Sequence, residues 1–159
     1  MPYANSHIIL ISFHNATPFL NNLMDKPNIE YAEGRVISFE DESAIQPSLL
    51  EIFTYTGPRQ HVSYQMNEFA AVCPFSGLPD TGIVWVEYIP RQKLVELKAL
   101  KYYFLSFRNV GIFQEAATAR IFNDLYPLLE PEELLIKTRY NTRGGIDATC
   151  TIDSNEQTS

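Results

Sequence analysis

The stretch Gly82-Ile-Val-Trp-Val-Glu-Tyr-Ile89 is rich in β-branched and aromatic residues and ends at Pro90, which predicts a β-strand. Before it, residues 61–72 alternate enough between apolar and polar side chains to predict a second strand. After it, the spacing of apolar and turn residues predicts two helices and then two strands, over 96–107, 113–129, 134–140 and 146–152. This order predicts an α+β fold in which two helices cover one face of an antiparallel sheet.

The size and composition of the chain are those of one globular domain. It has 159 residues, of which 45% are hydrophobic, and this is enough to build a hydrophobic core. We expect the catalytic domain over residues 49–152. We expect it to follow an N-terminal extension of unknown role over 1–48 and to precede a disordered polar tail over 153–159.

The charge and the cysteine content narrow the classes of function. The net charge of −7 argues against direct nucleic-acid binding. Nine of the twelve Lys and Arg residues lie between Arg91 and Arg143, so the second half could present a local positive site for a phosphate-bearing ligand. No run approaches the roughly 20 apolar residues of a membrane span. Two cysteines, Cys73 and Cys150, are too few for a disulfide framework or a zinc site, so we expect no bound metal. Free thiols predict a cytoplasmic protein.

The segment Cys73-Pro-Phe-Ser-Gly-Leu-Pro-Asp80 places a candidate nucleophile seven residues before a candidate acid. Its Pro and Gly residues predict a shaped loop between strands. A thiolate is a strong nucleophile at neutral pH, and a neighbouring carboxyl group could move the proton that such chemistry requires. The alternative is an inert buried cysteine beside a turn aspartate.

Two lysines mark the first predicted helix. Lys98 and Lys101 are three residues apart, so their amines share one face and could bind a phosphate. A solvated helix face is the alternative for this pattern. The apolar residues that share one face of this helix, and that we expect to be buried, are Leu97, Leu100, Phe104 and Phe107.

The second predicted helix opens with Phe113-Gln-Glu115. A glutamate in the first turn of a helix is common because it interacts favourably with the helix dipole. Its functional interpretation is a carboxylate that accepts two N–H bonds from a planar heterocycle. Arg143-Gly-Gly145 is predicted to be a hairpin turn and not a phosphate loop, because no helix follows it.

Together, residues 68–147 resemble the NADPH-dependent 7-cyano-7-deazaguanine reductases, the nitrile reductases of queuosine biosynthesis, over about half of the chain. The segments that carry the resemblance are in order and in register. They are Glu68-Phe69, Cys73-Pro-Phe-Ser-Gly-Leu-Pro-Asp80, Tyr88-Ile-Pro90, Val95-Glu-Leu-Lys-Ala-Leu-Lys-Tyr102, Ser106-Phe-Arg-Asn109, Phe113-Gln-Glu115, Asn123-Asp-Leu125 and Arg143-Gly-Gly-Ile146.

The resemblance implies a tunnelling fold, ring-shaped homo-oligomers with active sites between subunits, and NADPH as the cofactor. It implies that Cys73 is the nucleophile and Asp80 the proton-transfer partner in reducing 7-cyano-7-deazaguanine to 7-aminomethyl-7-deazaguanine. The implied substrate-binding residues are Phe113, Gln114 and Glu115, with Glu115 as the anchor for the deazapurine. The motif associated with NADPH is Glu96, Leu97, Lys98, Ala99 and Lys101.

Two alternatives remain open from the sequence. The related archaeal amidinotransferases use the same thioimide to make archaeosine in tRNA, but the Glu-Leu-Lys-Ala-Leu-Lys segment and the acidic composition argue against this activity. A binding protein that captures the nitrile without turnover is the other alternative. Its support is Gln114, which stands where the family usually has a histidine and which does not donate a proton near pH 7. Leu78 and Thr81 also replace the more usual Gln and Phe near the loop.

Overall fold

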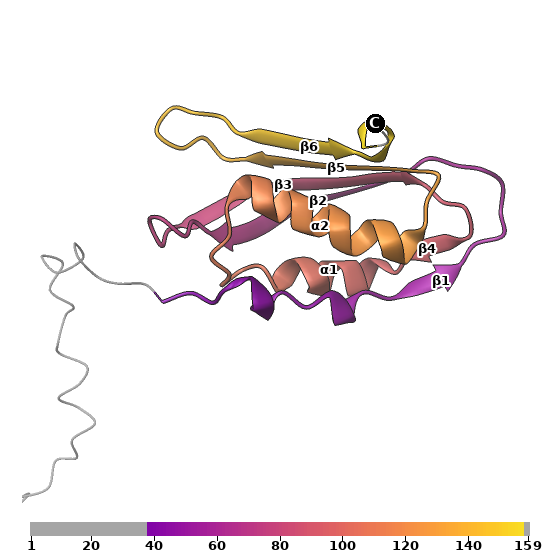
Figure 1. The fold of residues 1–159 in the computed structure, drawn as a ribbon, viewed down its shortest axis with the longest axis horizontal. Coiled ribbons are helices and arrows are strands. Elements are labelled where there is room, and N and C mark those ends of the chain that lie inside the picture. The colour runs from indigo at the N-terminus through magenta and orange to yellow at the C-terminus, as the bar shows by residue number, and fades with distance from the viewer. Residues whose placement is uncertain (1–37, 158–159) are drawn as a thin grey trace, which may run out of the picture. The chain divides into compact units, whose positions relative to one another are not determined.

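The computed structural model describes residues 38–157, which lie within one compact unit, Val36–Ser159. An antiparallel sheet of four strands has the order β2-β3-β5-β6 (Figure 1). Its strands are β2 (Val62–Val72), β3 (Pro79–Ile89), β5 (Glu133–Tyr140) and β6 (Thr149–Asp153). The helices α1 (Leu97–Leu105) and α2 (Gln114–Leu129) pack on one face of this sheet. The predicted α+β order of elements is therefore confirmed.

The sheet and the helices enclose one hydrophobic core. Residues facing the helices alternate along β3 and β5, as a sheet with one covered face requires. Phe69 of β2 packs edge-on against Phe104 of α1, at 6.0 Å between ring centres. The most deeply buried large side chains are Tyr88, Tyr103, Phe69, Phe107, Ile112, Ile121, Leu125, Leu129, Leu134 and Ile136.

Several predicted boundaries differ from the structure. β3 begins at Pro79, three residues earlier than predicted, and β6 begins at Thr149, three residues later. Two short strands were not predicted, β1 (Ile52–Thr54) and β4 (Lys93–Val95), which pair with each other in a separate small sheet. Three residues are too few to show the alternation that reveals a strand.

The expected apolar stripe of α1 is wrong at its first position. Leu100, Phe104 and Phe107 are buried, whereas the side chain of Leu97 is 57% exposed. Leu97 is the first helical residue and follows the capping residue Glu96, and its side chain borders an open groove between α1 and β2.

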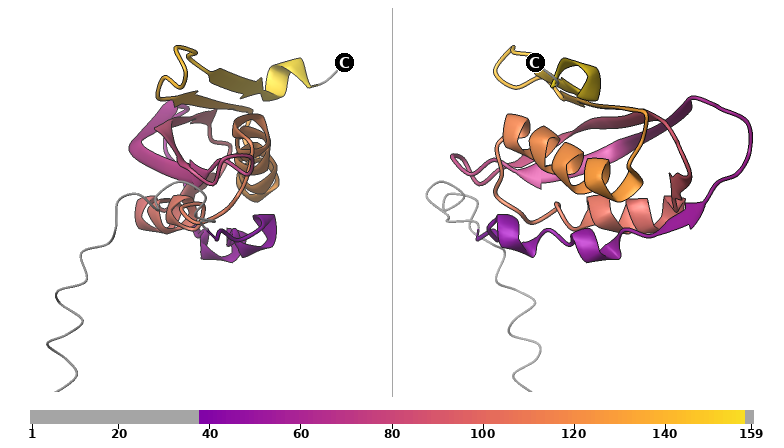
Figure 2. Two further views of the ribbon diagram at one scale, coloured as in Figure 1. Left: turned by 90° about the vertical axis from the view of Figure 1, so that its left-hand side faces the viewer. Right: turned by 45° about the vertical axis from the view of Figure 1, so that its right-hand side comes forward.

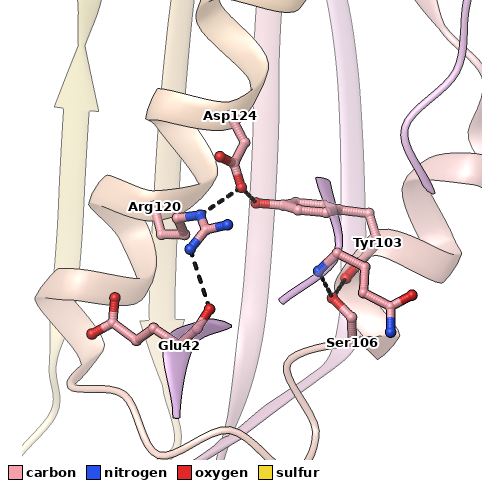
Figure 3. A network of polar contacts seen from close by, with 6 residues as sticks. Glu42, Tyr103, Ser106, Arg120 and Asp124 are labelled. Carbon is pink, nitrogen blue, oxygen red and sulfur yellow. Dashed lines mark hydrogen bonds and ion pairs between the residues drawn. The ribbon is translucent and has the colours of Figure 1, made fainter. Parts of the chain in front are cut away.

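The segment before β1, which the sequence assigned to an extension ending at residue 48, packs on the helices where it is described, from residue 38 onward. Gln46 donates its backbone N–H to Ser106 Oγ, and the guanidinium of Arg120 donates to the carbonyl of Glu42 (Figure 3). Arg120 also pairs with Asp124 at 2.7 Å, and the same carboxylate accepts the buried Tyr103 hydroxyl at 2.8 Å. These contacts join the segment to both helices. Residues 1–37 lie outside the described residues.

The prediction of a disordered tail from residue 153 is wrong for residues 153–157. Asp153 ends β6 and caps a short 3-10 helix, Ser154–Glu156, by accepting the backbone N–H of Asn155 at 2.9 Å. The buried Ser154 hydroxyl accepts the backbone N–H of Leu134 at 2.9 Å. The polar composition suggested disorder, but these side chains satisfy backbone groups in the fold. Within residues 38–157, no helix is long and apolar enough to cross a membrane.

Candidate active site

The loop between β2 and β3 is closed by its own backbone around Cys73. The N–H of Cys73 donates to the carbonyl of Leu78 at 2.9 Å, and the N–H of Gly77 donates to the carbonyl of Cys73 at 2.8 Å. Gly77 has a φ of 68°, a left-handed conformation that glycine adopts without steric cost. The turn therefore fixes the position of Cys73, which is half-buried.

Asp80 lies on β3 and faces the same side of the sheet as Cys73. It is opposite Ala71 in the register of β2 and β3. Cys73 follows Ala71 by two residues, and residues two apart in an extended chain point to the same face. The Asp80 side chain is only 4% exposed. The structure thus brings together the two residues that the sequence singled out as nucleophile and acid.

A third element reaches this pair, the hairpin between β5 and β6. Arg143 donates its guanidinium N–H to the carboxylate of Asp80 and, at 3.3 Å, to the hydroxyl of Ser76. The backbones of Arg143 and Ile146 exchange hydrogen bonds at 2.9 and 3.0 Å across the turn. Arg143 thereby connects the β2–β3 loop with β3.

The two glycines of this hairpin fit its shape. Gly144 and Gly145 have φ values of 55° and 80°, which are backbone conformations that residues with a Cβ atom rarely adopt. The start of the hairpin is tied to β3, because Asn141 donates its backbone N–H to the carbonyl of Thr81 at 2.9 Å and its side-chain amide to the Thr81 hydroxyl at 2.8 Å. The predicted turn is confirmed, and its Arg143 side chain contacts Asp80.

The surroundings of Cys73 favour its thiolate. The Ser76 hydroxyl makes the largest contribution in lowering the pKa of Cys73 below its ordinary value, and partial burial opposes this effect. Backbone N–H groups and Arg143 add to the lowering. The Asp80 carboxylate in turn raises the pKa of Arg143 above its ordinary value. A lowered thiol pKa is expected of a reactive cysteine.

The beginning of α2 lies beside this cluster. The backbone N–H of Ile112 donates to the carbonyl of Val72 at 3.0 Å. This contact places Phe113, the N-cap residue of α2, next to the Cys73 loop, with its side chain 59% exposed. Glu115 is exposed in the first turn of α2, and Gln114 is partly buried. The start of α2 therefore lies beside the loop that carries Cys73.

The proposed cofactor motif lies at the start of α1. The carboxylate of Glu96 caps the helix by accepting the backbone N–H of Ala99 at 2.7 Å. Bonds from the backbone N–H groups of Lys98 and Ala99 lower the pKa of Glu96. Ala99 is buried, which gives it a packing role, whereas Lys98 is exposed with its amine 5.8 Å from the centre of the Tyr102 ring.

A groove of about 370 Å³ separates α1 from β2. Its α1 wall includes Leu97, Leu100 and Lys101, and its β2 wall includes Glu68, beside an irregularity in the strand between Met66 and Phe69. The Lys101 amine pairs with the Glu68 carboxylate at 2.7 Å, and this contact lowers the pKa of Glu68. The groove combines apolar side chains with a cation, which is the composition of many small-molecule sites.

The two groups of candidate residues lie at opposite ends of the described unit. The β2–β3 loop, the start of α2 and the β5–β6 hairpin gather at one end, whereas β4 and the start of α1 lie at the other end (Figures 1 and 2). The structure therefore brings Cys73 and Asp80 together with the 113–115 segment, and it does not bring them to Glu96 or Lys98. Among residues 38–157, no group of three His, Cys, Asp or Glu residues could hold a metal ion.

Comparison with known proteins places this arrangement in a family. The model of the QueF-like protein family matches residues 79–159, a range that includes Asp80 and Arg143. A protein of Thermotoga petrophila is 50% identical over 126 residues, which are 79% of this chain and 92% of that protein. The chain belongs to the QueF-like protein family. The Thermotoga relative is named an NADPH-dependent 7-cyano-7-deazaguanine reductase, so the resemblance inferred from the sequence is confirmed.

Other relatives of this QueF-like protein support the same family. A protein of Caldicellulosiruptor bescii with the same name is 50% identical over 104 residues, 64% of this chain and 79% of that protein. The crystal structure of an apo archaeosine synthase, QueF-Like, has a TM-score of 0.55 at 20% identity, over 63% of this chain and 96% of that one. At this identity the match concerns the fold alone, and it agrees with the tunnelling fold expected from the sequence.

Sequence reasoning missed two residues of this site, Arg143 and Ser76. Ser76 lies inside the loop that the sequence selected, and a hydroxyl three residues after a candidate nucleophile was the available signal. Arg143 was interpreted as part of a turn and of a segment that carries the family resemblance, with no role of its own. Its role depends on contact with Asp80, 63 residues earlier in the chain, and this contact follows from the strand order β3-β5-β6.

Proposed function

We propose that this chain reduces 7-cyano-7-deazaguanine to 7-aminomethyl-7-deazaguanine with NADPH, in queuosine biosynthesis, through a covalent thioimide on Cys73. The observation that carries the proposal is the half-buried Cys73, with a lowered pKa, beside the Asp80–Arg143 ion pair. The names of the relatives supply the substrate and the cofactor.

The residues around Cys73 suit addition to a nitrile. The Cys73 sulfur attacks the nitrile carbon, which makes a difficult reduction easier by dividing it into steps. Asp80 delivers a proton to the nitrile nitrogen as the C–S bond forms. Glu115, exposed at the start of α2, accepts N–H bonds from the deazapurine, and Phe113 presents an exposed ring beside the same loop. The chain itself thus supplies a nucleophile, a proton carrier and an anchor.

The residues of α1 fit a nicotinamide dinucleotide. Lys98 and Lys101 are both exposed cations on one helix, and Lys101 borders the groove beside the apolar Leu97 and Leu100. Cations of this kind bind phosphates, and apolar side chains pack against planar rings. NADPH, when bound, supplies the hydrides that convert a nitrile to a primary amine. Glu96 fixes the first turn of the helix that presents the lysines.

Replacing both lysines by alanine should weaken NADPH use while leaving the reaction of Cys73 with the nitrile intact. We expect the NADPH concentration for half-maximal rate to rise about tenfold or more, since charge-assisted contacts to phosphate would be lost. Steady-state NADPH oxidation measures this change, and intact-protein mass spectrometry measures the nitrile adduct.

Two control variants accompany the double replacement. Lys137→Ala removes an exposed lysine from β5 and should leave both readouts unchanged. Glu68→Gln removes the partner of Lys101 and shows whether that ion pair matters by itself. Equal loss of adduct formation in the double variant would contradict a cofactor role and assign the lysines to the substrate pocket or to the fold.

We further propose that the site is completed between subunits of a ring. Within the described part of the chain, the order β2-β3-β5-β6 leaves β2 and β6 as the edges of the sheet. An edge strand can pair with the other edge of a second copy, and repeated head-to-tail pairing closes a ring. Such an arrangement could bring the α1 residues of one copy to the Cys73 cluster of the next.

The central experiment incubates the protein with 7-cyano-7-deazaguanine and NADPH and follows NADPH absorbance and product mass. A reductase should consume two NADPH for each amine formed. Adduct without NADPH consumption would instead support nitrile capture, the alternative suggested by Gln114. Transfer of ammonia or another amine to nitrile-bearing tRNA without NADPH would support an amidinotransferase. The two free cysteines and the use of NADPH are consistent with a cytoplasmic enzyme, and we propose this location.

A further inference from the structure

We propose that Arg143 is a positioning residue that holds the Asp80 carboxylate and the Cys73 loop in the arrangement needed for proton transfer from the thiol. The part of this inference that concerns the nitrile rests on the proposed function. The effect of Arg143 on the Cys73 thiol does not depend on the proposed function, because it is measured on the protein without nitrile or NADPH.

One guanidinium joins both halves of the site. Arg143 donates through one nitrogen to Asp80 and through the other to Ser76. Asp80 belongs to β3, Ser76 belongs to the loop that carries Cys73, and Arg143 comes from the β5–β6 hairpin. The planar fork of an arginine fixes the directions of both bonds, which a lysine amine does not do.

The burial of the two partners indicates that Asp80 depends on Arg143. The Asp80 side chain is 4% exposed and the Arg143 side chain 37% exposed. A buried carboxylate requires a partner, whereas a guanidinium with access to water can remain solvated without one. The buried Asp80 carboxylate therefore depends on Arg143 as its hydrogen-bonding and ion-pair partner.

Arg143 is the charged group that contacts the thiol, and it also binds the Asp80 carboxylate. Glu115 on α2 and Asp80 both lie near the Tyr140 hydroxyl. In the step we infer, the Cys73 S–H bond breaks and its proton moves to the Asp80 carboxylate. The sulfur then adds to the nitrile carbon, one C–N π bond breaks, and the same proton passes from Asp80 to the nitrile nitrogen. The step is balanced without a further reactant, and Asp80 returns to the carboxylate that Arg143 holds.

The test compares Arg143→Met and Arg143→Lys with the unaltered protein. The rate of Cys73 alkylation by iodoacetamide is measured against pH without nitrile or NADPH, and nitrile adduct formation is measured by intact mass. Cys150 is replaced by alanine in all samples, so that the measured alkylation is that of Cys73. Arg139→Met is the matched control, because it removes an exposed arginine from β5 that contacts the ring of Trp85 and not Asp80.

We expect Arg143→Met to move the alkylation profile to higher pH. Arg143 favours the Cys73 thiolate, so its loss raises the pKa of Cys73 and slows alkylation at pH 7. Adduct formation should fall about 10- to 100-fold, the effect expected of misplaced reacting groups. Arg143→Lys should restore most of the pH profile but little of the adduct rate. Arg139→Met should change neither.

Three results would overturn the inference. One is an alkylation profile and adduct rate in Arg143→Met equal to those of Arg139→Met. Another is full recovery of the adduct rate in Arg143→Lys, because the positive charge at position 143 would then account for the whole effect without the guanidinium geometry. The third is an effect of Arg143→Met that is equally large in an Asp80→Asn background, since Arg143 would then not act through Asp80. If the unaltered protein forms no adduct, the proposed function fails, while the alkylation profile still tests the role of Arg143 toward the thiol.

Discussion

Cys73→Ala is expected to abolish both the covalent nitrile adduct and NADPH oxidation. A thioimide requires a sulfur nucleophile, and Cys73 is the thiol whose pKa is lowered and whose loop reaches Asp80 through Arg143. Intact-protein mass spectrometry after incubation with the nitrile should show the mass of one added substrate on the unaltered protein and none on the variant. NADPH oxidation should fall to the rate without enzyme.

The chain provides its own control in Cys150→Ala. Cys150 lies on β6 opposite Thr138 of β5, and β5 separates β6 from β3 and β2. Cys150 is likewise a partly buried free thiol. This variant should retain adduct and turnover. Adduct on Cys150, or turnover by Cys73→Ala, would reject the thioimide mechanism for this protein while leaving the fold and the family unaffected.

The strands of the main sheet and both helices were predictable because each is long enough to show the characteristic spacing of its apolar residues. The core strand Gly82–Ile89 and both helices repeat apolar residues over two turns or several alternations, and the structure contains them with shifts of a few residues at the ends. The hydrophobic and polar patterns gave wrong predictions where a local interaction determines the structure. Leu97 follows the helical period but lies at an exposed helix end, and the polar residues after 152 satisfy backbone groups.

The candidate site was predictable where its residues are neighbours in sequence. Cys73 and Asp80 are seven residues apart in one segment, and Phe113, Gln114 and Glu115 are consecutive at the start of one helix. The contribution of Arg143 was not predictable in this way, because it depends on a contact with Asp80, 63 residues earlier in the chain. The sequence also leaves the role of Glu96 ambiguous, since a carboxylate before a helix serves equally as a cap and as a ligand. In the structure it is a cap.

Asp80→Asn is expected to slow adduct formation by about 10²- to 10⁴-fold, the usual contribution of a general acid–base group. Asparagine preserves the size of the side chain and can still accept a bond from Arg143, but its amide neither takes the thiol proton nor delivers one to the nitrile nitrogen. The time course of adduct formation, followed by intact mass at fixed nitrile concentration, measures the loss. Alkylation of Cys73 with iodoacetamide shows whether the thiol remains accessible.

The matched control for this change is Asp124→Asn. Asp124 also pairs with an arginine, Arg120, and is also mostly buried, at 15% side-chain exposure, but it belongs to the network that joins α1 and α2 (Figure 3). We expect it to lower the melting temperature and to leave the adduct rate nearly unchanged. If Asp80→Asn slowed adduct formation no more than Asp124→Asn did, the loss of a buried ion pair would explain the effect. Water or another group would then carry the proton, and Asp80 would be a structural partner of Arg143 only.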